Sequence, residues 1–227
     1  MQSVQDQNRN LSNVEQYNLA RNLARQKRLE FGIQTEKINI PLLKKICKKE
    51  NVKVDLVEKI GTRIRAAYFF DEDGASILLK KDLPREPKMF ALAHELKHHF
   101  LDREDIADGK MRCGDYNENK TIEIAAEEFA AEFLYPILEM QRLVNSINIR
   151  TGSCTPKQIV EVKRRSPVAV SYTFVRKRLE RFGIITKEQF ADIQFQKLEE
   201  QLYPPLYKQD WFKRVRARKK IMRHSRK

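Results

Sequence analysis

Apolar residues recur at helical spacing along two segments near the start of the chain. Between Val14 and Phe31 the apolar residues Val14, Tyr17, Leu19, Leu23 and Leu29 stand among Arg and Lys, which predicts an amphipathic first helix. Gly32 follows it, and glycine is the residue type that most often ends a helix. Ile40–Glu50 repeats the spacing over a shorter length and has proline at its second position, which predicts a second helix.

Three short runs with strand character come next. Val52–Leu56 is the first, and Arg63–Phe70 and Ala75–Lys80 are rich in aromatic, β-branched and aliphatic residues. The last two are joined by Asp-Glu-Asp-Gly at positions 71–74, where the glycine supplies the positive φ that a tight turn needs. The sequence therefore predicts a β-hairpin ahead of the next helix.

The rest of the pattern is helical. Met89–Leu101 is an apolar helical run, and Thr121–Tyr135 reads as a helix that Pro136 ends. Pro156–Arg164 and Ser171–Phe182 form a pair of helices with a short break between them, as in a helix-turn-helix. We therefore predict a mostly helical α+β fold with a small sheet.

The helical run contains a motif with specific chemistry, His94-Glu95-Leu96-Lys97-His98. Histidines four positions apart point the same way from a helix, one turn above the other, and can bind one tetrahedral zinc ion. Glu95, beside the first ligand, is placed to take a proton from water. The pattern is the signature of zinc peptidases. The alternative is an amphipathic helix with ordinary histidines.

Zinc needs a third protein ligand, and the other two histidines are poor candidates. His99 lies about 100° around the helix from His98, and His224 lies in a charged tail. A carboxylate is therefore expected. Candidates are Asp102, Asp105, Asp108, Asp115, Glu118, Glu123, Glu127, Glu128 and Glu132.

Among these carboxylates we favour Glu123, because it lies at the edge of the apolar face of the helix over 121–135. A carboxylate in that position is partly buried and needs a partner such as a metal. Glu127, one turn on, is expected to accept a hydrogen bond from the free ring nitrogen of a ligating histidine. Glu128 and Glu132 are expected to form a solvated face. Asp102 is the weaker alternative as third ligand.

The runs FALAHELKHHFLD and EIAAEEFAAEFLYP together resemble the two motifs of the ImmA/IrrE metallopeptidases over roughly residues 15–185. Aligning the second run on Pro136 places the family's third ligand on Glu123. The chain departs from the family pattern at Lys97 (usually Gly), Glu127 (usually Asn) and Tyr135 (usually Met).

The resemblance implies a zincin-like peptidase core with one zinc per chain held by His94, His98 and Glu123, and with Glu95 as the catalytic base. It implies a narrow substrate, a helix-turn-helix repressor whose site-specific cleavage derepresses prophage or mobile-element genes. It also suggests that the second hairpin strand, Ala75–Lys80, is an edge strand that pairs with substrate. The alternative is a sheet edge that only packs the core.

The composition of the chain bears on the cellular compartment in which the protein is expected. No apolar stretch approaches the 18 residues of a membrane span, and residues 1–10 lack an apolar signal region, so a cytoplasmic protein with no membrane partner is expected. Cys47, Cys113 and Cys154 are odd in number and lack metal-site spacing. They are expected to be free thiols of a reducing compartment.

Basic residues gather near the C-terminus. Residues 211–227 hold nine Lys or Arg and no acid, so that removing them lowers the net charge from +14 to +5 (14 − 9). Such a tail favours non-specific binding to nucleic acid; a basic helix against an acidic partner and a solubilising end are alternatives. The expected recognition helix also holds four basic residues, Arg176, Lys177, Arg178 and Arg181, though a packing subdomain explains it equally well.

These expectations divide the chain into four parts. Residues 1–37 are an N-terminal helical segment, 38–145 the zinc peptidase core, 146–185 a helix-turn-helix-like subdomain, and 186–227 a helical extension with the basic tail. The predicted function is zinc metalloendopeptidase. The alternative is a DNA-binding regulator or anti-repressor that acts by binding and keeps a vestigial or structural metal site.

Overall fold

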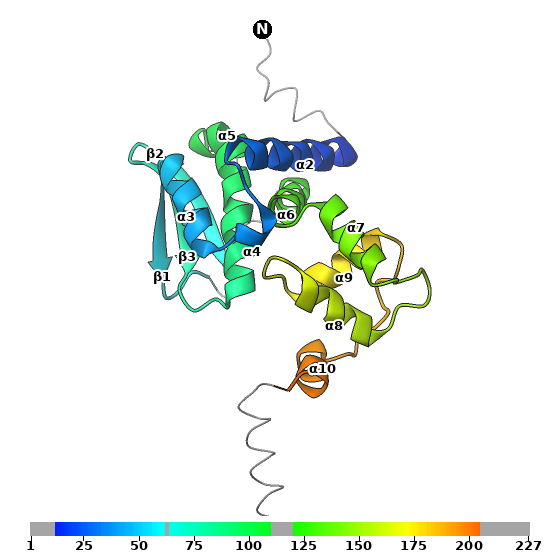
Figure 1. The fold of residues 1–227 in the computed structure, drawn as a ribbon. Helices are drawn as coiled ribbons and strands as arrows, with labels where there is room; N and C mark the ends of the chain where they lie inside the picture. The colour runs from blue at the N-terminus through cyan, green and yellow to red at the C-terminus, as the bar shows by residue number, and fades with distance from the viewer. Residues whose placement is uncertain (1–11, 62–63, 110–119, 205–227) are drawn as a thin grey trace, which may run out of the picture.

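A computed structural model describes residues 12–61, 64–109 and 120–204 (Figure 1). The basic tail, His224, Cys113, Asp115 and Glu118 lie outside these residues. The elements are α2 (Asn13–Glu30), η1 (Thr35–Lys37), α3 (Ile40–Lys49), β1 (Val52–Val57), β2 (Ala66–Asp71), β3 (Gly74–Lys80), α4 (Arg85–Lys97), η2 (His98–Asp102), α5 (Arg103–Ala107), α6 (Lys120–Leu134), α7 (Ile137–Ser146), α8 (Pro156–Arg165), α9 (Tyr172–Arg181) and α10 (Phe195–Leu202). The predicted mostly helical α+β fold is confirmed.

The small sheet has the strand order β1-β3-β2. β2 and β3 form the predicted antiparallel hairpin, with Gly74 at φ 102° in its turn, and β1 pairs with β3 in parallel. β3 is therefore the central strand, and the expectation that it is an edge strand is wrong. The open edges belong to β1 and β2, because β1 pairs with β3 and not with β2, the strand that follows it in the chain.

Helix α4 packs one face on this sheet and another on α6, as Figure 1 shows. Met89, Leu92, Ala93 and Leu96 are fully buried in the contact. Alanines fill much of the facing side of α6, and their small side chains let the two helices approach closely. The helix continues past Lys97 as the π-helical turn η2.

Helix α6 lies between α4, α2 and α9, so most of its residues are buried. Arg21 and Arg25 of α2 donate hydrogen bonds to Glu128 (2.8 Å) and Glu132 (2.9 Å), and Glu132 is only 1% exposed. The expectation that these two glutamates form a solvated face is therefore wrong. Arginines on α2 and α9 cover them, and the ion pairs offset the cost of removing carboxylates from water.

Helices α7 to α10 extend the same core rather than building a separate one. Ser171 caps α9, and Thr155 and Gln158 form a capping box at α8, so both predicted helices begin where their caps place them. The buried side chains of α6 to α9 form one continuous cluster with those of α4. The four-part division of the chain stays a prediction. None of the described helices is long and apolar enough to span a membrane.

Candidate metal centre

Two helices bring the three expected ligands together. His94 lies in the last turn of α4 and His98 begins η2, so their rings project from one face, 5.1 Å apart between centroids. Glu123 lies in the first turn of α6 and is 2% exposed. These three residues are the metal-ligand group found among the described residues.

The distances within this group fit a tetrahedral ion. The Nε2 atoms of His94 and His98 lie 3.3 Å apart, and Glu123 oxygens lie 3.0 Å from the first and 3.8 Å from the second. Ligands about 2.1 Å from a tetrahedral zinc lie about 3.4 Å from one another. Two imidazole nitrogens and a carboxylate are also the donor set of catalytic zinc sites. The residues present therefore fit zinc.

Glu95 lies beside this group, away from water. Its side chain is 4% exposed, and Oε2 is a buried oxygen without a hydrogen-bond partner among the described residues. The backbone N–H of Tyr68 in β2 hydrogen-bonds to the carboxylate. Burial raises the pKa of Glu95, although the two neighbouring histidines lower it in part. A buried carboxylate with one free oxygen is suited to accepting a proton.

Burial acts on His94 in the opposite sense. Burial alone lowers the pKa of its imidazole, but the hydrogen bond to Glu123 and the charges of the surrounding carboxylates outweigh it and raise the pKa. The excess of carboxylates around the ring is what a divalent cation would neutralise.

The structure shows one carboxylate that orients a ligand histidine, Asp102. Asp102 Oδ2 lies 2.6 Å from His98 Nδ1 and also 2.6 Å from the Nζ of Lys97, which is 1% exposed. Burial would raise the pKa of Asp102, yet the charge of Lys97 and the bond from His98 lower it overall. The carboxylate thus fixes the His98 ring with Nε2 toward the metal group.

The contact between His98 and Asp102 can be predicted from the sequence. Asp102 is four residues after His98, the spacing at which helical side chains meet. The predicted helical run ended at Leu101, and the π-helical turn continues the helix through Asp102. Lys97, noted only as a departure from the family pattern, is the second partner of that carboxylate.

The other candidates lie elsewhere. Glu127 accepts a hydrogen bond from Lys177 Nζ (2.9 Å). His99 points away from the metal group, as expected, and its Nδ1 lies 3.0 Å from the Tyr68 hydroxyl. Burial and nearby cations lower its pKa to about 4. Asp105 and Asp108 are not in the ligand group.

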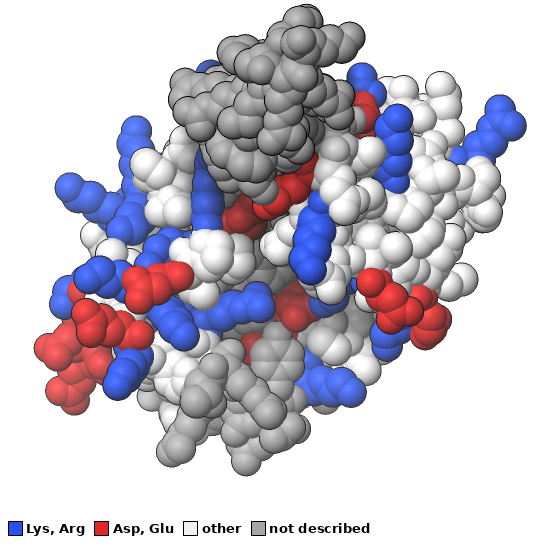
Figure 2. Space-filling model, turned by 90° about the horizontal axis from the view of Figure 1, so that it is seen from below, with Lys and Arg blue, Asp and Glu red and all other residues white. Residues whose placement is uncertain are grey.

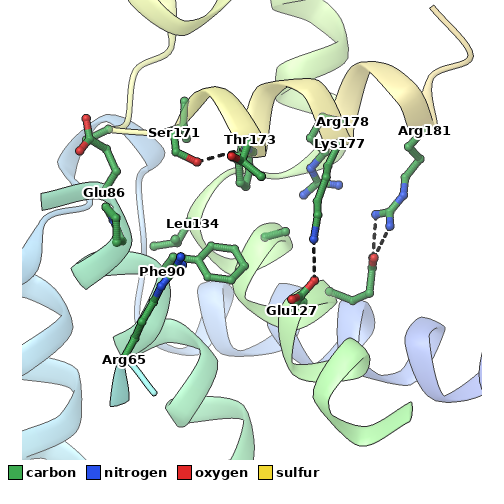
Figure 3. A pocket seen from close by; sticks show the side chains of 16 residues that line it. Arg65, Glu86, Phe90, Glu127, Leu134, Ser171, Thr173, Lys177, Arg178 and Arg181 are labelled. Atoms are coloured by element: carbon green, nitrogen blue, oxygen red, sulfur yellow. Dashed lines mark hydrogen bonds and ion pairs between the residues drawn. The ribbon is translucent and has the colours of Figure 1, made fainter. Parts of the chain in front are cut away.

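The four basic residues expected on the recognition helix are all engaged within the protein. Lys177 and Arg181 of α9 reach carboxylates on α6, as the dashed lines in Figure 3 show. Arg178 is 3% exposed. The partners are Glu127 for Lys177, Glu128 for Arg181, Glu132 and the Tyr135 carbonyl for Arg178, and the carbonyls of Lys187 and Gln189 for Arg176. This pairing favours the packing role of α9 over the DNA-reading role.

Comparison with known proteins agrees with the motifs. No curated protein matches the chain significantly. A solved Mycobacterium tuberculosis transcriptional regulator aligns with it at 17% identity and a TM-score of 0.48, covering 78% of this chain and 49% of that one. The chain thus spans about half of that protein's length. Residues 47–147 match the peptidase M78 family model, described as an IrrE N-terminal-like domain. This segment contains α4, η2 and α6 with all three ligand candidates, and it confirms the predicted resemblance to the ImmA/IrrE family over that part of the chain.

Proposed function

We propose that the protein is a zinc metalloendopeptidase that cleaves a helix-turn-helix repressor. The observation that carries the proposal is the compact group of His94, His98 and Glu123 with the buried, partly unpartnered carboxylate of Glu95 beside it. A site that served only to bind metal for stability would have no use for that free oxygen, and leaving it buried costs free energy.

The residues divide the work of peptide hydrolysis. His94, His98 and Glu123 would hold the zinc, and Asp102 would keep His98 turned toward it. Zinc, when bound, polarises the scissile carbonyl and lowers the pKa of water. Glu95 accepts the proton of the attacking water at Oε2 and delivers it to the leaving nitrogen. Its raised pKa suits it to the second transfer as well as the first.

The strand that would pair with substrate is β2 instead of β3. Arg65 O accepts a hydrogen bond from Lys80 N of the hairpin partner, so backbone groups of alternate residues, Ala66, Tyr68 and Phe70, point to the open edge. The Tyr68 N–H on that edge meets Glu95. A substrate added along this edge would therefore pass the metal group.

The alternative, a regulator that acts by binding DNA, has less support. The basic side chains of α9 are paired inward, and on the face drawn in Figure 2 basic side chains are interleaved with acidic ones instead of forming one patch. The remaining support for the DNA-binding alternative is the basic tail at 211–227, which lies outside the described residues.

The experiment is co-expression with a helix-turn-helix repressor, chosen from any that the source genome encodes beside this gene. We expect repressor fragments with the wild-type protein and none with Glu95→Gln, which keeps zinc but cannot accept the proton. Glu104→Gln, an exposed site on α5, is the matched control and should cleave normally. Undiminished cleavage by Glu95→Gln would refute the mechanism. An intact repressor that co-purifies with the wild-type protein would instead support the binding alternative.

A further inference from the structure

A partly open cavity of about 270 Å³ lies between α4, α6 and α9 (Figure 3). Phe90, one turn before His94, and Glu127, one turn after Glu123, both line it. Helical neighbours four residues apart lie about 5–6 Å from each other. The cavity is therefore one helical turn from the metal group along both helices.

The size and the floor of this cavity suit a single side chain. Its volume equals that of roughly nine water molecules at about 30 Å³ each. Phe90, Leu134 and Phe174 supply apolar surface, and Figure 3 shows the Phe90 ring and Leu134 facing the same space. An apolar stem would pack against these groups.

Most carboxylates that line the cavity are already neutralised. Glu127 pairs with Lys177, and Glu128 accepts hydrogen bonds from Arg181 and Arg21. Glu86 is the third, and in Figure 3 its carboxylate points away from Arg65, toward the start of α9.

Two guanidinium groups in the lining offer hydrogen-bond donors to a ligand. Arg178 is buried and pairs with Glu132 through Nη2, but its Nε has no hydrogen-bond partner among the described residues. Arg65, an exposed residue at the rim of the lining, has no ion pair within residues 12–61, 64–109 and 120–204. Burial lowers the pKa of Arg178 to about 10 in spite of the nearby Glu132. The cavity thus has donors and positive charge that an anionic group would satisfy.

We propose that this cavity receives an acidic side chain of the protein substrate, glutamate or aspartate, one or two residues from the cleaved bond. This rests on the proposed peptidase function. A strand rises about 3.3 Å per residue, so one helical turn of about 5–6 Å corresponds to one or two substrate residues. The side chain in the cavity would therefore belong to a residue one or two positions from the cleaved bond. Arg65 directly precedes β2, so a substrate paired with that edge passes the cavity.

The test uses zinc-loaded full-length protein and four peptidyl hydroxamates, identical except for Glu, Gln, Leu or Lys beside the zinc-binding group. Calorimetry measures their affinities without any need for cleavage. We expect the Glu compound to bind at least about tenfold tighter than its isosteric Gln analogue, because it adds charged hydrogen bonds. Arg65→Gln should remove that preference and leave the Leu compound unchanged, and Arg65→Glu should favour the Lys compound. Arg142→Gln, an exposed charge on α7 outside the lining, is the control and should change nothing.

The outcomes separate the two proposals. Equal binding of the Glu and Gln compounds, tightest binding of the Leu compound, or full Glu preference in Arg65→Gln would each overturn the acidic pocket while leaving the metal site intact. If no hydroxamate binds, the metal site itself is wrong, and the pocket proposal falls with it.

Discussion

Replacing Asp102 with alanine removes one carboxylate oxygen that two buried groups share. His98 Nδ1 and Lys97 Nζ both lie 2.6 Å from Oδ2. The substitution should therefore have two effects, because it frees the His98 ring and leaves the Lys97 ammonium buried without a partner. We expect the first effect in metal affinity and the second in the free energy of unfolding.

The two effects differ in size. Loss of the hydrogen bond that orients a ligating histidine typically lowers metal affinity about 10- to 100-fold, about 1.4–2.7 kcal/mol. An uncompensated buried charge costs about 3–5 kcal/mol. The double variant Lys97→Met/Asp102→Leu fills the same space without charge, so its apo stability should return close to wild type. Its zinc affinity should stay low, because His98 still lacks an acceptor.

Urea unfolding of the zinc-free proteins, followed by circular dichroism, measures the stability, and competition with a chromophoric chelator measures the zinc affinity. Asp102→Ala should have a lower free energy of unfolding and a lower zinc affinity than the wild-type protein. The double variant should have a lower zinc affinity alone. Wild-type zinc affinity in the double variant would refute the orienting role of Asp102. Unchanged unfolding of Asp102→Ala would show that the ion pair with Lys97 is not buried as described.

Other predictions test the ligands, the thiols and the tail. Glu123→Gln should purify with little zinc by atomic emission, whereas Glu127→Gln, whose carboxylate pairs with Lys177, should carry about one per chain; equal contents would remove Glu123 from the site. Zinc at 100 times its Kd should stabilise the wild-type protein by about 2.7 kcal/mol, and a chelator should remove that gain; a thermal midpoint unmoved by either would argue against a structured metal site. Burial raises the pKa of Cys47 to about 12, so its thiol should react with a thiol reagent only on unfolding. Because the thiol of the unfolded chain has an ordinary pKa of 9.0, the stability of the fold that depends on this thiol should be complete below pH 9.0 and fall as pH rises toward 12. Deleting residues 211–227 should abolish salt-sensitive DNA binding without changing repressor cleavage in solution; retained DNA binding would place that activity elsewhere.

Local sequence determined the elements and most of the metal group. The four-residue spacing of His94 and His98 places both rings on one face of a helix whatever surrounds it. Ser171 ahead of α9 and the glycine turn at Gly74 fix local structure in the same way. Glu123 followed from its place at the edge of an apolar face.

Only the tertiary structure decided which polar groups are buried and which strand is central. From the sequence alone, Glu128 and Glu132 were predicted to form a solvated face. In the structure, arginines of α2 and α9 cover them. β3 is the central strand because β1 pairs with it and not with β2, and this choice is made by tertiary packing. Periodicity is a property of one helix or strand, so a sequence can display it alone. The burial of a charge depends on a partner more than a hundred residues away in the case of Arg21 and Glu128, and no local pattern records that partner.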